Sequence, residues 1–185
     1  MRVIAGKAKG ARLVTVEGLS VRPTTDRIKE TLFNILAPDL YGCVFLDLFC
    51  GSGAIGIEAL RRGAEKAYFV DRDKRSISCV RENLRHTHLE DSACLMRMDA
   101  AAAVRSLNQQ KVHADIIFMD PPYGKGLEKE VLLALSDASS LADTETLIIV
   151  EESLDTDLSY LSSGGYSRIR TKAYKTNQHV FVRKT

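Results

Sequence analysis

The tetrad Asp120-Pro121-Pro122-Tyr123 combines the residue types in this chain that are best suited to chemistry. It follows the apolar run Ile116–Met119, so a buried strand is expected to end at the carboxylate. The prolines fix φ near about −65° and lack amide protons, so the segment offers mainly hydrogen-bond acceptors. An exocyclic amine could donate to Asp120 and to a proline-segment carbonyl while its planar ring stacks on Tyr123. The tetrad therefore predicts chemistry on a nucleobase amino group, and a plain strand-ending turn is the alternative.

A glycine-rich loop forms the second candidate site. Gly51–Gly56 reads GxGxxG, and Asp71 follows after about twenty residues, as in a dinucleotide-binding motif. Asp47 argues against a dinucleotide because its carboxylate would lie close to the pyrophosphate. S-adenosylmethionine has no phosphate and carries a sulfonium and an ammonium group, which an acid stabilises. The loop therefore favours S-adenosylmethionine, and an NAD-type oxidoreductase stays open as an alternative.

We assign cofactor contacts at the strand ends. Gly51 and Gly53 allow close backbone approach to the methionine part, and Asp47 accepts from its ammonium directly or through water. Asp71 binds the ribose hydroxyls, and Asp99 or the amide of Ala100 contacts the adenine. Helix capping or solvation is the alternative for each acid, most clearly for Asp99. The expected cofactor-binding residues are Asp47, Phe49, Gly51, Ser52, Gly53, Asp71, Arg72, Asp99, Ala100 and Asp120.

Composition and charge fit a soluble protein with a polyanionic partner. The chain has 185 residues, of which 45% are hydrophobic and 27% charged, and it lacks a membrane-length apolar run or a signal peptide. The net charge is +3 over residues 1–40, −7 over 41–165 and +6 over 166–185. Basic ends around an acidic body favour a phosphate-rich partner over simple surface solvation. The four cysteines form no CxxC pair, which favours a reduced cytoplasmic interior over disulfides or a metal site.

Short apolar runs alternate with helix-length amphipathic segments, which predicts βαβ units, a mostly parallel sheet and helices on both faces. Candidate acids fall at the carboxyl ends of the strands, where such sheets bind ligands. The expected strands are 44–49, 67–71, 93–98, 115–119 and 146–151, and the expected helices are 53–62, 73–87, 100–109 and 126–138.

Both ends of the chain depart from this alternation. Two strand-like runs, 168–175 and 179–184, predict a closing antiparallel hairpin and seven strands in all. Residues 3–16 predict a small basic β-hairpin, and a capped helix is expected from about residue 26 to Leu36. We expect one globular unit, with residues 1–20 as a basic extension and 21–185 as the catalytic domain. No heptad or surplus apolar helix is evident, which favours a monomer.

These residues resemble the RsmD family of bacterial 16S rRNA guanine-N2 methyltransferases. The resemblance rests on Asp47–Gly53, Asp71, the tetrad, the start Arg2-Val-Ile-Ala-Gly-Lys, the basic closing hairpin and the segment 22–34, which reads RPTTDRIKETLFN. The tetrad is shared with other amino methyltransferases, whereas segment 22–34 is specific to the family. Cys50 stands where the family often has alanine. The resemblance implies a class I (Rossmann-like) methyltransferase fold, S-adenosylmethionine as donor, and a guanine in 16S rRNA or the small ribosomal subunit as acceptor.

The expected mechanism is direct in-line methyl transfer, without a metal or a covalent intermediate. Asp120 and the Pro121 carbonyl hold the amine in line, and Tyr123 clamps the splayed base, so Asp120, Pro121, Pro122 and Tyr123 are the expected catalytic residues. An adenine-N6 methyltransferase acting on RNA or DNA and a non-catalytic RNA-binding assembly factor remain alternatives. The expected RNA-binding residues are Arg2, Lys7, Lys9, Arg12, Arg22, Thr24 and Arg27.

Overall fold

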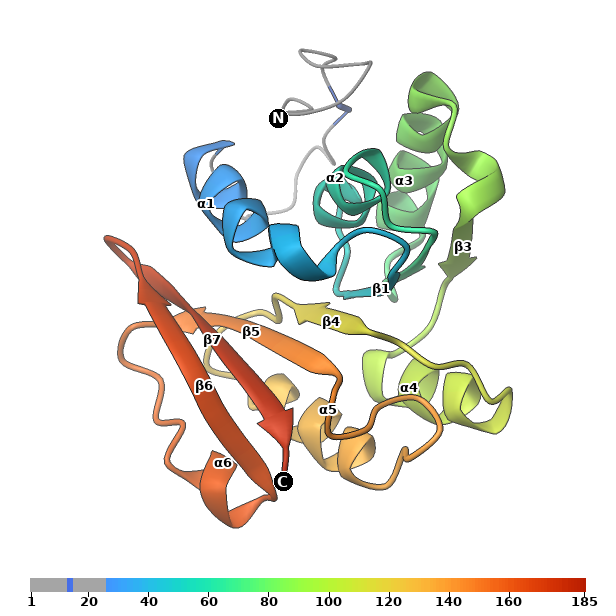
Figure 1. Ribbon diagram of the computed structural model, residues 1–185. Coiled ribbons are helices and arrows are strands. Elements are labelled where there is room, and N and C mark those ends of the chain that lie inside the picture. The colour runs from blue at the N-terminus through green and yellow to red at the C-terminus, as the bar shows by residue number, and fades with distance from the viewer. Residues whose placement is uncertain (1–12, 15–25) are drawn as a thin grey trace. The chain divides into compact units, whose positions relative to one another are not determined.

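A computed structural model describes residues 13–14 and 26–185 (Figure 1). Within these residues, seven strands follow the order β3-β2-β1-β4-β5-β7-β6. The pairs β1–β2, β2–β3 and β4–β5 are parallel, whereas β5–β7 and β6–β7 are antiparallel. The predicted mostly parallel α/β sheet with a closing antiparallel hairpin is therefore confirmed. Of the expected N-terminal hairpin, residues 3–16, only residues 13 and 14 are described, and the boundary at residue 20 lies outside the described residues.

The chain divides into two compact units, Met1–Met98 and Asp99–Thr185. The described elements of the first unit are α1 (Asp26–Leu36), η1 (Ala37–Asp39), β1 (Val44–Leu48), α2 (Ala54–Arg61), β2 (Lys66–Val70), α3 (Lys74–Thr87), η2 (Glu90–Ser92) and β3 (Ala93–Met96). The second unit contains α4 (Ala100–Gln109), β4 (Ile116–Met119), α5 (Leu127–Ser136), β5 (Leu147–Ser153), α6 (Tyr160–Ser163), β6 (Tyr166–Ala173) and β7 (Asn177–Lys184).

In the first unit, buried charges join the helices α1 and α2. Lys29 and Glu58 are fully or almost fully buried and form an ion pair at 3.9 Å between Nζ and Oε2. Arg62 binds the other oxygen of Glu58 at 2.8 Å and places its guanidinium 5.2 Å from the centre of the Phe33 ring. Burial lowers the pKa of Lys29, and Glu58 opposes that shift. A buried charge is tolerated only when it is paired in this way, so the cluster fixes α1 against α2.

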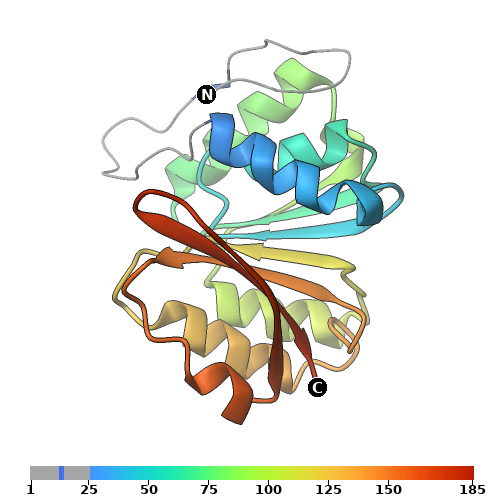
Figure 2. The same cartoon turned by 60° about the vertical axis from the view of Figure 1, so that its left-hand side comes forward.

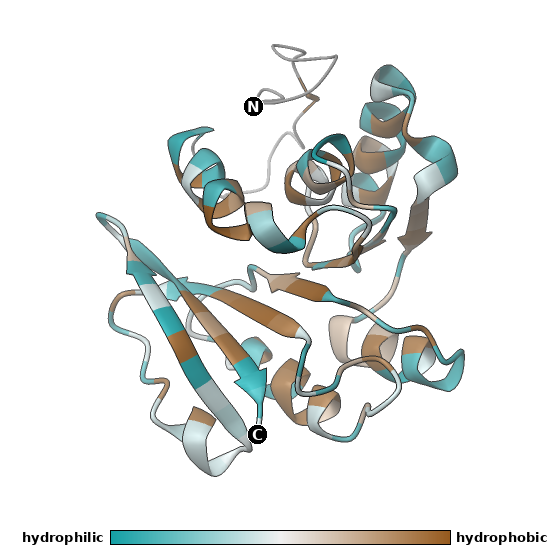
Figure 3. Ribbon diagram, in the orientation of Figure 1, coloured by the Kyte–Doolittle hydropathy of each residue, from teal (hydrophilic) through white to brown (hydrophobic). Residues whose placement is uncertain are grey.

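In the second unit, the central strands β4 and β5 are buried, and their brown colour marks all of β4 and most of β5 as apolar (Figure 3). Helices α4 and α5 lie side by side on one face of these strands (Figures 1 and 2). Tyr166 of β6 donates its hydroxyl to the carbonyl of Leu132 in α5, and Lys184 of β7 donates to Ala142 at 2.9 Å. The terminal hairpin is thus attached to the helical layer by its own polar side chains.

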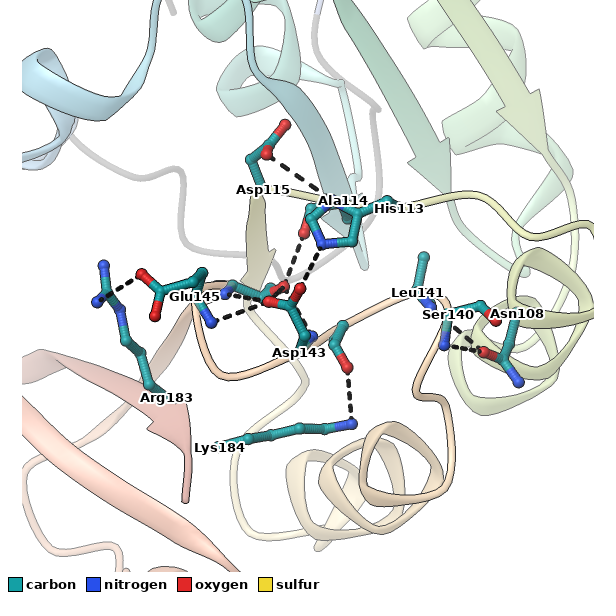
Figure 4. Close-up of polar contacts among 12 residues, drawn as sticks. Asn108, His113, Ala114, Asp115, Ser140, Leu141, Asp143, Glu145, Arg183 and Lys184 are labelled. Atoms are coloured by element: carbon teal, nitrogen blue, oxygen red, sulfur yellow. Dashed lines mark hydrogen bonds and ion pairs between the residues drawn. The ribbon is translucent and has the colours of Figure 1, made fainter.

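Polar side chains also organise the turns that precede β4 and β5 (Figure 4). Asp143 Oδ1 accepts from the amides of Glu145 and Thr146 at 2.8 and 3.1 Å, and its other oxygen lies 3.2 Å from His113. Asn108 accepts from the amides of Ser140 and Leu141 at 2.9 and 3.2 Å. These bonds satisfy backbone groups of the connection between α5 and β5, at the ends of the strands away from the tetrad.

Candidate active site

The loop that follows β1, Phe49–Gly53, is a tight turn rich in left-handed residues and is called the cofactor loop below. Gly51 and Gly53 have φ of 52° and 76°, values at which glycine is unstrained. Gly53 also caps α2, so the backbone turns directly from the strand into the helix. Phe49 has φ of 63°, a conformation that is uncommon and costly for a bulky residue. The first two glycines of the motif therefore make the turn, and their close approach to a cofactor stays a prediction.

Gly56, the third glycine of the motif, serves helix–strand packing. A Cβ added there would lie 2.4 Å from Cε1 of Phe69 in β2. This spacing brings α2 close to the sheet and points its first turn at the end of β1. The amide of Gly56 in that turn donates to Oδ2 of Asp47 at 2.9 Å.

Asp47 is a buried acid within β1. Its residue is 2% exposed, and burial raises its pKa to about 7, with a further contribution from the nearby charge of Asp71. The hydrogen bond from Gly56 opposes this shift. Asp47 therefore fixes the start of α2 under the cofactor loop, and its contact with a cofactor ammonium remains a prediction.

Asp71 follows β2 and joins two backbone segments. Its Oδ2 accepts from the amide of Gly51 at 3.0 Å, and its Oδ1 accepts from the amide of Asp73 at 2.8 Å. A carboxylate has about four lone-pair positions, so both oxygens retain capacity for a pair of hydroxyls. Neighbouring Arg72 is exposed.

Sequence reasoning missed Asn83, which supports the cofactor loop from α3. Its side chain is fully buried and its Nδ2 donates at 3.0 Å to the carbonyls of both Ser52 and Val14. Its Oδ1 accepts from the amide of Val14 at 2.8 Å. An asparagine on the inward face of an amphipathic helix is the signal that could have identified it.

The tetrad follows β4 in the second unit. All four residues of β4 are buried, Asp120 is partly exposed, Pro121 is buried, and the Tyr123 residue is 43% exposed. A rigid buried strand therefore delivers a carboxylate and an accessible aromatic face to the surface of this unit. The Tyr123 hydroxyl donates to Oε1 of Glu151 in β5 at 3.4 Å.

Glu151 belongs to a buried polar array that the sequence analysis did not include. Asn177 donates to Oε1 of Glu151, and Nε2 of His179 lies 2.9 Å from Oε2. Tyr174 completes the array, with its hydroxyl 3.0 Å from Nδ1 of His179. The sequence signal for this array is the presence of polar residues at inward-facing positions of the otherwise apolar strand β7.

The remaining predicted residues fall into two groups. Asp99 caps α4 by accepting from the amide of Ala102 at 3.1 Å, and Ala100 is buried in the first turn of that helix. Arg27 is exposed in α1, and its carbonyl accepts from Thr31. The predicted RNA-binding residues outside the described part of the chain are Arg2, Lys7, Lys9, Arg12, Arg22 and Thr24.

Comparison with known proteins identifies the family. A family model described as Conserved hypothetical protein 95 matches residues 1–183. A Bacillus subtilis protein named Putative rRNA methyltransferase YlbH is 42% identical over 158 residues, which cover 85% of each chain. Escherichia coli Ribosomal RNA small subunit methyltransferase D is 37% identical over 85% of this chain and 77% of that protein. The chain belongs to this family, the RsmD family.

The solved structures agree with the family assignment. Putative methyltransferase yhhF from Escherichia coli superposes with a TM-score of 0.84 at 34% identity, covering 100% of this chain and 97% of that one. A Streptococcus mutans protein titled a putative SAM-dependent methyltransferase shares the fold, with a TM-score of 0.69 at 16% identity over 95% of this chain and 52% of that one. This RsmD-family protein therefore has the class I methyltransferase fold, and S-adenosylmethionine is the methyl donor of that class. The oxidoreductase interpretation of GxGxxG is excluded.

The first unit fits this donor. Asp71 retains acceptor capacity for ribose hydroxyls, and a Cβ on Gly51 would meet no atom within 4 Å, so the loop leaves open space where the backbone bends. Burial raises the pKa of Cys50 well above its usual range, which leaves this thiol a packing group. Within the described residues, no cluster of His, Cys, Asp and Glu could hold a metal ion, and no helix is long and apolar enough to cross a membrane.

Proposed function

We propose that this RsmD-family protein transfers a methyl group from S-adenosylmethionine to the exocyclic N2 amine of a guanine in 16S rRNA. The observation that carries the proposal is the tetrad, in which a buried strand presents Asp120 beside the exposed ring of Tyr123. The name of the Escherichia coli relative, which refers to ribosomal RNA of the small subunit, supports the acceptor. Segment 22–34, which resembles the guanine-specific family, supports guanine N2 over adenine N6.

The bound donor supplies an electrophilic methyl group on its sulfonium, and the chain positions the acceptor. An exocyclic guanine nitrogen is a weak nucleophile because its lone pair is delocalised into the ring. Asp120 and the Pro121 carbonyl accept its two protons, which orients the nitrogen and favours a more pyramidal geometry. As the new C–N bond forms, the methyl–sulfur bond would break and leave its electron pair on a neutral thioether. Asp120 stabilises the positive charge on the nitrogen and accepts a proton late in the step. Tyr123 stacks on the base.

The outer strand β6 offers a basic surface for the RNA backbone. Residues 166–185 contain six Lys or Arg and no acid. Arg170 pairs with Phe181 and Lys172 pairs with His179, so both basic residues share the sheet face of the Glu151–His179 pair. Helices α4 and α5 pack on the other face, where Tyr166 and Lys184 contact α5. Arg170 and Lys172 are thus suited to hold phosphates beside a base stacked on Tyr123.

The test is methylation of 16S rRNA from a strain that lacks the modification, followed by mass spectrometry of the nucleosides. We expect N2-methylguanosine with the wild-type protein and a loss of at least ~100-fold in rate with Asp120→Asn, which retains the shape but not the charge. The control is Asp115→Asn, because Asp115 is an exposed acid just before β4. N6-methyladenosine as the product would refute the guanine assignment, and full activity of Asp120→Asn would refute the mechanism.

A further inference from the structure

The Tyr123 side chain is fixed at one end and accessible at the other. Its hydroxyl donates to Glu151, which is only 4% exposed, whereas the tyrosine itself is 43% exposed. The distance of 3.4 Å is long for such a bond, and hydrogen bonds at catalytic sites often shorten when the substrate binds. Burial, followed by the charge of Glu151, raises the pKa of Tyr123, so the phenol remains a neutral donor. The bond therefore holds the hydroxyl end of the Tyr123 side chain at one point, which is called the pivot below.

The carboxylate at this pivot is itself held on both oxygens. Oε1 accepts from Nδ2 of Asn177 as well as from Tyr123, and Oε2 pairs with Nε2 of His179 at 2.9 Å. These donors compensate a carboxylate that would otherwise be costly to bury. Glu151 and His179 are also direct cross-strand partners in the register of β5 and β7, so the backbone holds both side chains on one face.

His179 is oriented by three further contacts. Its Nε2 lies 2.9 Å from the carboxylate of Glu151, which can only accept, so this nitrogen donates, and Nδ1 lies 3.0 Å from the Tyr174 hydroxyl. The ring meets Tyr174 at an interplanar angle of 76° and Phe118 at 86°, both edge-to-face. Phe118 lies in β4, two residues before Asp120. The array thus connects the hairpin, β5 and the strand that carries the tetrad.

We propose that Glu151, oriented by His179 and Tyr174, is a positioning residue that sets the tilt of the Tyr123 ring for stacking on the acceptor base. This inference rests on the proposed function, since it requires a base at the tetrad. Asp120 fixes the amine at one edge of the base, and the tilt of Tyr123 fixes the plane in which that amine presents its lone pair. A purely structural array would stabilise the sheet without affecting the methyl-transfer step.

A double-mutant cycle separates these two roles. Tyr123→Phe keeps the stacking surface and removes the hydrogen bond between Tyr123 and Glu151. Glu151→Gln removes the negative charge of the group that accepts this hydrogen bond. We expect each to lower the single-turnover methylation rate at saturating rRNA about tenfold and to leave the KM for rRNA within about twofold. The double variant is expected to be no slower than the slower single variant, because both changes remove one interaction. Affinity for S-adenosylmethionine should stay unchanged.

The chain offers a matched control. Tyr160 donates to Oε1 of Glu128 at the same 3.4 Å in the same unit, and neither residue belongs to the tetrad or to the Glu151 array. Tyr160→Phe should leave the single-turnover rate unchanged, while its thermal unfolding midpoint changes by about as much as that of Tyr123→Phe. Multiplicative losses in the double variant, or an equal loss in Tyr160→Phe, would overturn the positioning role.

Two safeguards keep the outcomes distinct. If Glu151→Gln does not fold, His179→Gln takes its place in the cycle, since it removes the group that orients Glu151 and leaves the carboxylate. Wild-type protein is assayed first, and a wild type that methylates no rRNA overturns both the function and the positioning role. If the wild type is active and the rate losses of the two single variants multiply in the double variant, only the positioning role is overturned.

Discussion

Asp71 accepts a hydrogen bond from the amide of Gly51 at 3.0 Å, so the acid that follows β2 holds the loop that follows β1. The same carboxylate accepts from its own chain at Asp73, which orients both oxygens. One side chain therefore shapes the cofactor loop and retains acceptor positions for ribose. This dual role makes Asp71 the most informative residue for testing cofactor binding.

Replacing Asp71 by asparagine should weaken S-adenosylmethionine binding. The amide keeps one acceptor and loses the charge, so the hydroxyl contact and the bond to Gly51 compete for a single oxygen. A hydrogen bond to a charged group contributes about 1.5–3 kcal/mol, which corresponds to a roughly 10–100-fold rise in Kd by titration calorimetry. Asp91→Asn, at an exposed acid of the same unit, should bind normally. An unchanged Kd for Asp71→Asn would show that Asp71 does not contact the cofactor.

Substituting Gly56 by alanine should destabilise the fold, because the new Cβ would lie 2.4 Å from Phe69. Overpacking of a core costs about 1–3 kcal/mol in the free energy of unfolding, measurable by urea denaturation. Phe69→Leu in the same chain makes room for the methyl group. The double variant should therefore lose less stability than the sum of the two single losses. If the two losses in free energy of unfolding simply add, the contact between α2 and β2 is not the cause of the destabilisation by Gly56→Ala.

The buried acid Asp47 should make stability fall as the pH rises towards neutrality. Its pKa is about 7 in the folded protein, whereas an aspartate in water has an ordinary value of 3.8. Between about pH 4 and 7 the folded state therefore binds more protons than the unfolded state, and the free energy of unfolding decreases with rising pH. Asp47→Asn should remove this contribution. The free energy of unfolding of the variant, relative to that of wild type, should therefore increase by about 2 kcal/mol between pH 5 and pH 8.

Chemical denaturation at pH 5 and pH 8 measures this difference. Asp73→Asn provides the control, because Arg75 holds the pKa of the partly exposed Asp73 below its usual range and the group stays ionised over this interval. A constant difference between Asp47→Asn and wild type would show that Asp47 is already ionised at pH 5.

Neutralising Arg170 and Lys172 should weaken RNA binding. Removal of one phosphate-binding cation should reduce the slope of log affinity against log salt by about 0.7–0.9. The control is Arg105→Gln, at an exposed arginine of α4 on the opposite face. Fluorescence anisotropy with 16S rRNA fragments at several salt concentrations tests the slopes. Equal slopes for Arg170→Gln/Lys172→Gln and wild type would exclude β6 from the RNA contact, and aggregation of this variant would instead indicate that the charges protect an edge strand.

The alternation of apolar runs and amphipathic segments predicts most of the elements within a residue or two. The segment 100–109 coincides with α4, and the run 44–49 differs from β1 by one residue. The β5 strand extends to Ser153, two residues beyond its predicted end, because antiparallel pairing with β7 continues through Asn177. The short helix α6 carries too little periodicity to be recognised from the sequence.

The local motifs predict methyl transfer from S-adenosylmethionine because the residues that carry each motif lie close together in the chain. The glycines report backbone turns, and the tetrad lies within four consecutive residues at the end of an apolar strand. Asn83 and the array of Glu151 with His179 were missed because their partners lie 31 and 28 residues away in the chain. The tertiary structure alone decided that Tyr123 is anchored to a buried carboxylate. Strand register brings that carboxylate opposite a histidine, and the sequence does not specify register between distant strands.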